Sequence, residues 1–152
     1  MATLNPVFQV ESERIHRDHQ EMLHELSALD LALEHMGTGS KDMTDLHCVV
    51  KARALTLALT RQLPEHCMRE ENILYGTIAE VSKELAAFVE EMKREHIDLF
   101  VRLNAFCVAQ DELANATDLG AAVMNLKEMG LEVSRALRHH ITTEEHELQG
   151  FL

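Results

Sequence analysis

The chain contains no tryptophan, one tyrosine, two prolines and six glycines among its 152 residues. Its apolar runs are all shorter than the roughly 18 residues that a membrane-spanning helix needs. Runs of β-branched residues are short and scattered, which disfavours a sheet. Leu, Ala, Met and Glu are abundant, and these residues favour helices. The sequence therefore predicts one all-α domain that covers residues 1–152.

Basic residues are also scarce, since 14 Lys and Arg stand against 26 Asp and Glu and the formal net charge is −12. This balance disfavours nucleic acid and anionic membrane surfaces as partners, because both need basic side chains. The N-terminal segment lacks the basic start and long apolar stretch of a signal peptide, so we expect a cytoplasmic protein. Cys48, Cys67 and Cys107 form no C-x-x-C pair, and we expect them to be reduced thiols.

Apolar residues recur at helical spacing in four segments, at about 12–36, 42–75, 82–110 and 118–148. Ser12 is a suitable N-cap, so residues 1–11 are expected to form an extended N-terminal arm. Pro64 is expected to bend the second helix, and Gly76 to mark its end. Four amphipathic helices with short connections predict an up-down-up-down four-helix bundle.

A histidine pattern occurs twice along the chain. A lone histidine is followed, 47 residues later in the first half and 44 in the second, by H-x-x-x-E. Residues four apart lie on one face of a helix, so each H-x-x-x-E pair can direct an imidazole and a carboxylate at one point. The pattern supplies one interior histidine for every predicted helix and two inward carboxylates: His19, His66, Glu70, His96, His140 and Glu144.

These six residues are candidate metal ligands. Each buried, unpaired carboxylate would cost several kcal/mol, and metal ions supply the positive charge that would offset this cost. Imidazole and carboxylate suit iron, manganese or zinc, and two irons with a bridging oxo or hydroxo group are our first expectation. Two imidazoles per iron would leave open positions, which indicate chemistry or small-ligand binding. Cys67 follows His66 directly and is turned about 100° away on a helix, so we do not expect it to be a ligand.

Other histidines compete for this role. His16 and His24 each end an E-x-x-H pair, a motif of ferritin-like di-iron proteins, but both pairs lie on the same predicted helix and are expected to be solvated. Glu71 and Glu145 each follow a proposed ligand and could lie on a charged outer face or support the ligands. Four further histidines are expected to lie off the apolar stripe or near helix ends: His35, His47, His139 and His146. Counted from the predicted turns, the two histidines of each half are expected to differ by roughly 10 Å in position along the bundle axis.

Around these residues the chain resembles the hemerythrin-like, HHE cation-binding family. The matching segments are RDHQEML, EHCMREENILY, REHIDLF and HHITTEEHEL, and the resemblance covers residues 12–148. It implies a four-helix bundle with a non-haem di-iron centre. Oxygen-carrying hemerythrins have a further histidine where this chain has Phe100, and an aspartate where it has Glu144. The four-histidine, two-glutamate set is more similar to branches involved in iron–sulfur repair, nitric oxide or peroxide chemistry, and iron or oxygen sensing.

Three functions stay open at this point, and whether the chain turns over a substrate is undecided. The first is a sensor or binder of O2, NO or peroxide that a redox or signalling protein would read. The second is a redox enzyme or an iron donor for cluster repair, and the third is a passive metal buffer. A donor such as Tyr75 near the centre would favour proton-coupled chemistry. An apolar lining of the open site would instead favour ligand binding without reaction. The candidate residues for this lining are Met22, Leu23, Leu63, Leu99, Phe100, Leu103 and Leu137.

Overall fold

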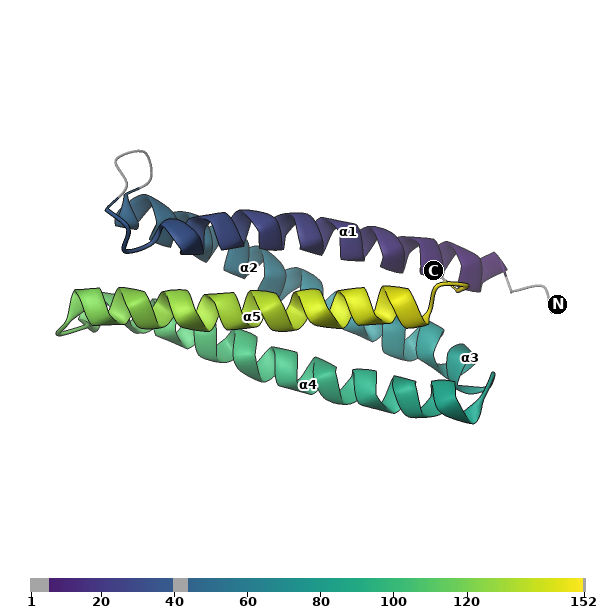
Figure 1. Cartoon of the computed structure of the whole chain (residues 1–152). Coiled ribbons are helices and arrows are strands. Elements are labelled where there is room, and N and C mark those ends of the chain that lie inside the picture. Colours follow the sequence, from purple (N-terminus) through teal and green to yellow (C-terminus); the bar gives the residue numbers. More distant parts are fainter. Residues whose placement is uncertain (1–5, 40–43, 152) are drawn as a thin grey trace.

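The computed structural model describes residues 6–39 and 44–151, and these fold into four long helices packed as an antiparallel bundle (Figure 1). The first long helix is α1 (Pro6–His35), and the second is α2 (Asp45–Arg69), which continues as a π-helical segment, η1 (Glu70–Leu74), and as α3 (Tyr75–Ala79). The third and fourth are α4 (Lys83–Glu112) and α5 (Leu119–Glu147), joined through a 3₁₀ turn, η2 (Leu113–Asn115). This arrangement confirms the predicted all-α bundle.

The helix starts follow local capping chemistry. The side chains of Thr44, Ser82 and Asp118 each accept a hydrogen bond from the backbone N–H three residues later. At the end of α1, Gly37 has φ of +75°, a left-handed conformation that favours glycine. The Gly37 N–H donates to Asp45 Oδ1 at 2.8 Å, which ties the end of α1 to the start of α2.

Two predicted boundaries are wrong. Residues 6–11 are helical rather than extended, because Pro6 takes the first helical position, where its missing N–H costs nothing. The rest of the predicted arm, residues 1–5, lies outside the described residues, as do residues 42 and 43 of the second predicted helix. Gly76 does not end the second helix but lies inside α3, which continues to Ala79. The hydrogen-bond spacing of this helix changes from α-helical to π-helical at Glu70, six residues after Pro64.

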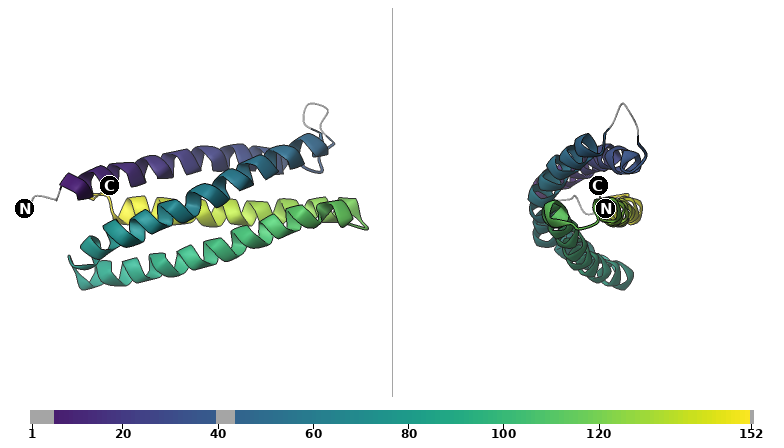
Figure 2. Two further views of the ribbon diagram at one scale, coloured as in Figure 1. Left: turned by 180° about the vertical axis from the view of Figure 1, so that it is seen from behind. Right: turned by 90° about the vertical axis from the view of Figure 1, so that its left-hand side faces the viewer.

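The four long helices surround one core, in which α1 packs against α2 and α5, and α4 packs against α5 and α2 (Figure 2). Two apolar clusters fill this core. The larger includes Leu29, Leu59 and Phe106, and the smaller includes Ile15 and Ile78. Between them lies a polar layer formed by the histidines and glutamates of the repeated pattern. No helix within residues 6–39 and 44–151 has the length and apolarity to cross a membrane.

Candidate metal centre

All six predicted ligands lie together in this polar layer. One comes from α1, one from α2, one from η1, one from α4 and two from α5. Each residue exposes at most 2% of its surface, which is rare for side chains that can carry charge. The sequence predicts that the histidines of each half differ in position along the bundle axis, but in the structure all six side chains still meet in this layer. The six residues are His19, His66, Glu70, His96, His140 and Glu144.

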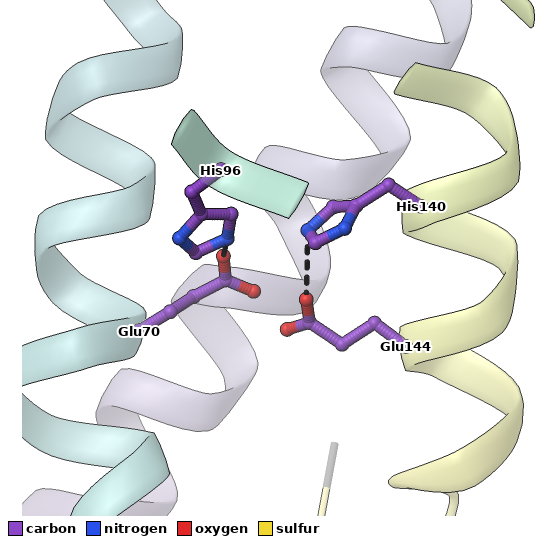
Figure 3. A group of neighbouring side chains, drawn as sticks. All are labelled: Glu70, His96, His140 and Glu144. Atoms are coloured by element: carbon purple, nitrogen blue, oxygen red, sulfur yellow. Dashed lines mark ion pairs between the residues drawn. The ribbon is translucent and has the colours of Figure 1, made fainter. Parts of the chain in front are cut away.

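The donor atoms of these residues form two groups, in each of which they lie within 4.8 Å of one another. One group is His19, His66 and Glu70. The other is Glu70, His96, His140 and Glu144, and Figure 3 shows their side chains converging from three sides on one space. Glu70 belongs to both groups, so its carboxylate is placed to bridge two metal ions.

The imidazole Nε2 atoms face carboxylate oxygens at short distances. His66 Nε2 and His96 Nε2 each lie 3.1 Å from Glu70 Oε1, and His140 Nε2 lies 3.2 Å from Glu144 Oε2 (Figure 3 shows the last two pairs). A metal ion with bonds of about 2.0–2.2 Å places neighbouring donors roughly 3 Å apart. The separations therefore fit donors that share a coordination shell.

Several of these inward atoms have no hydrogen-bond partner among the described residues. They include the Nε2 atoms of His19, His66 and His140, together with both carboxylate oxygens of Glu70. A buried polar atom without a partner costs free energy, and several of them in one layer would be hard to retain in a stable fold. Lone pairs that face one space are what metal coordination requires, so the donor set fits a pair of cations.

Charge in the layer is strongly coupled. Burial raises the pKa of Glu70 well above its ordinary value, and the carboxylate of Glu144 beside it raises that pKa further. Burial and the neighbouring His140 lower the pKa of His96 to about 3, so His96 stays neutral at physiological pH. A neutral imidazole keeps a lone pair available to a metal ion. Two cations would also favour the ionised form of Glu70.

Four outer carboxylates face the other ring nitrogens. Each follows or precedes a proposed ligand in the sequence but faces a histidine on the next helix around the bundle. Three contacts are hydrogen bonds that fix the Nδ1–H tautomer and point the Nε2 lone pair inward. The Nδ1 contacts are Asp18 with His66 at 3.1 Å, Glu95 with His140 at 2.6 Å, Glu145 with His19 at 2.6 Å, and Glu71 with His96 at 3.7 Å.

Of the four contacts between outer carboxylates and histidines, the one made by Glu71 is the weakest. The 3.7 Å separation is too long for a hydrogen bond, and Glu71 is 37% exposed.

We expect Glu95→Ala to weaken metal binding by about 10–100-fold, because His140 loses the partner that orients it. The matched variant Glu71→Ala should have a smaller effect. Competition with a chelator measures both, and equal losses would contradict the difference between the two contacts.

The π-helical segment brings one further side chain to the centre. In an uninterrupted α-helix, Tyr75 would lie about 180° from His66 and face away from the ligands. In the structure the Tyr75 N–H instead bonds to the carbonyl of Glu70, five residues earlier, and the helix after it is turned back toward the core. The Tyr75 hydroxyl donates to Glu144 Oε2 at 3.0 Å and lies 3.3 Å from His96 Nε2.

The remaining histidines do not join either donor group. His24 and His139 are exposed, as the sequence predicts. His16 is also at the surface, but its Nδ1 lies 2.9 Å from Glu145 Oε1, a contact that the sequence pattern does not predict. Asp18 and Glu95 were missed as supporting residues. An acidic residue directly before the lone histidine in both halves is the signal that could have identified them.

Comparison with protein-family models gives a match to the hemerythrin HHE cation binding domain over residues 10–152. Searches of curated proteins and of solved structures give no match. The matched region contains all six proposed ligands and the four outer carboxylates. With its four-helix bundle and its buried histidine–glutamate layer, the chain belongs to the hemerythrin HHE cation-binding family.

Proposed function

We propose that this chain is a non-haem di-iron protein whose centre binds or reacts with a small oxidant or diatomic ligand: O2, NO or peroxide. The observation that carries the proposal is the pair of buried donor groups that share Glu70. All of their donors are nitrogen or oxygen, a set that suits iron and also manganese or zinc. Cys67 is in neither group, and burial raises the pKa of its thiol, so it stays protonated.

The number of protein donors supports a reactive role rather than a sealed structural one. The group around His19 has three donor residues and the group around His96 has four, whereas iron commonly accepts more. Open positions let a small molecule reach the metal, and the bound metal would supply Lewis acidity and electrons. A cavity of about 190 Å³ between α1 and α2 is lined in part by His66, so it reaches the outer side of one proposed ligand.

Tyr75 favours reaction over plain oxygen carriage. A wall made only of apolar side chains would protect bound oxygen, and buried Met22, Leu63 and Leu99 supply part of such a wall. The hydroxyl of Tyr75 interrupts it with a polar group that touches Glu144 and His96. We therefore favour a reaction with peroxide or NO over a carrier or a passive metal buffer.

The adjacent residues His139 and His140 provide a matched test. Protein from iron-supplied cells should contain about two irons per chain and, after reduction, consume peroxide or NO. His140→Ala should lower the iron content and remove the activity, because it deletes a buried inward nitrogen. His139→Ala removes an exposed imidazole and should change neither. Wild-type protein that holds only zinc, or equal activity in both variants, would contradict the proposal.

A further inference from the structure

Tyr75 is the only tyrosine in the chain, and its side chain is fully buried at the centre. A buried phenol normally finds a hydrogen-bond partner in the protein. The partners of this hydroxyl are both proposed metal ligands, since it lies 3.0 Å from Glu144 Oε2 and 3.3 Å from His96 Nε2. Its oxygen therefore belongs to the same cluster of donor atoms as the ligands themselves.

The distances place this oxygen where a ligand would be. Proposed donors of the same group are 3.1 Å apart between His96 and Glu70, and 3.2 Å apart between His140 and Glu144. The Tyr75 oxygen is separated from two donors by nearly the same distances. An outer hydrogen-bonding group would be expected near one ligand atom on the side away from the metal, as the four outer carboxylates are. Tyr75 instead approaches His96 at Nε2, the nitrogen that faces the centre.

The second half of the chain has no counterpart to this residue. The two H-x-x-x-E pairs are 74 residues apart, and the position 74 residues after Tyr75 is Gln149. The helix α5 runs through Glu144 without a π-helical segment and ends at Glu147, before that position. The repeat is therefore symmetric in its six shared ligands and asymmetric at Tyr75. Glu144 and His96 both belong to the four-residue group, so any effect of Tyr75 falls on that ion.

We propose that Tyr75 is a ligand, through its phenolate oxygen, of the ion held by Glu70, His96, His140 and Glu144. This inference rests on the proposed function, because it needs iron in the centre. The O–H bond breaks as the metal–oxygen bond forms, the proton passes to solvent, and no electron is transferred. Without metal the hydroxyl keeps its proton and donates to Glu144, as the structure shows. The consequence is a pair of chemically unlike ions, one of which has an extra anionic oxygen donor.

Resonance Raman spectroscopy of the ferric protein tests this directly. A phenolate bound to ferric iron gives a visible charge-transfer band, and excitation in that band enhances tyrosine ring vibrations. These vibrations should shift when the cells are grown with ring-deuterated tyrosine. Because the chain has one tyrosine, such a shift can come only from Tyr75. The wild-type protein alone therefore decides the question, even if a variant folds poorly.

The matched variant is Tyr75→Phe, which removes one oxygen and keeps the ring. We expect it to retain about two irons per chain and to lose the ring vibrations and the charge-transfer band completely. Two irons in the wild type without tyrosine vibrations would overturn the ligand assignment and leave the proposed function intact. A visible band of unchanged intensity in Tyr75→Phe would show that the band does not come from a phenolate and would also overturn the ligand assignment. A chain that binds no iron would contradict both proposals.

Discussion

Replacing Glu70 with alanine is expected to remove both metal ions from the protein. Glu70 is the one residue that belongs to both donor groups, so its loss takes a ligand from each. The loss of affinity should exceed the roughly 10–100-fold that follows when an outer hydrogen-bond partner is deleted. Because metal binding and folding are coupled, the variant grown with iron should unfold at the same temperature as the same variant stripped of metal.

The neighbouring glutamate supplies the control for this experiment. Glu71 is the next residue in the same π-helical segment, but its carboxylate faces outward and is partly exposed. Glu71→Ala should therefore retain most of the metal and most of the added thermal stability. Elemental analysis and thermal unfolding followed by circular dichroism measure both quantities. Two tightly bound ions in Glu70→Ala would show that Glu70 is not a ligand of either.

Acidification is expected to release the metal, with the loss beginning at or above the ordinary imidazole range of about pH 6.5. Burial disfavours the charged form of His19, but contacts with Glu145 and Glu70 outweigh this effect and raise its pKa. Burial has the same effect on His140, and contacts with Glu144 and Glu95 likewise raise its pKa. Protons therefore compete for these two nitrogens earlier than they would for an isolated imidazole.

The sign of the effect on stability differs between the two forms of the protein. In the metal-free protein, a raised histidine pKa adds stability that is fully present below the unfolded pKa and is lost as pH rises through the folded value. In the metal-bound protein, the same protonation removes ligands, so stability supplied by the metal disappears as pH falls. The two unfolding temperatures should converge on acidification. Retention of both ions down to about pH 4.5 would exclude His19 and His140 as ligands.

The inward side chains that we propose as ligands could be placed from the sequence because helical periodicity is regular over long segments. Residues four apart share a face whatever surrounds the helix, so His66 with Glu70 and His140 with Glu144 followed from spacing alone. Each lone histidine continued the apolar stripe of its helix, as His19 does between Ile15 and Met22. The same periodicity established the bundle, and the structure confirms both the bundle and the convergence of these side chains.

The separation of the two histidines of each half along the bundle axis is smaller than the sequence predicts. The count from the sequence assumed that both helices end at one turn residue, whereas the connection between them has a length of its own. In the structure α1 ends at His35 and α2 begins at Asp45. Counted from these ends, His19 and His66 differ by five residues, or about 7 Å along the helix axes. The inclination of α2 across the bundle, visible in Figure 2, takes up more of this distance.

The position of Tyr75 could not be derived, because it depends on a change of helical register that no residue type signals. A regular helix would have turned Tyr75 away from the centre, and nothing in the segment EENILY marks a π-helical turn. The start of α1 at Pro6 was missed for a different reason. Ser12 is a good N-cap by composition, but the helix buries Phe8 against the smaller apolar cluster, and this packing outweighs the local signal.

The contact between Glu145 and His19 joins the last long helix of the chain to the first. Ribosomes deliver α1 and α2 long before α5, so His19, His66 and Glu70 emerge as one nearly complete donor group while half of the bundle is still unmade. At that stage His19 has no Glu145 to orient it, and nothing covers the layer on the side of α4 and α5. If the centre holds metal as proposed, a nascent chain would hold it loosely until translation reaches the end of α5, and tight retention would require the finished bundle.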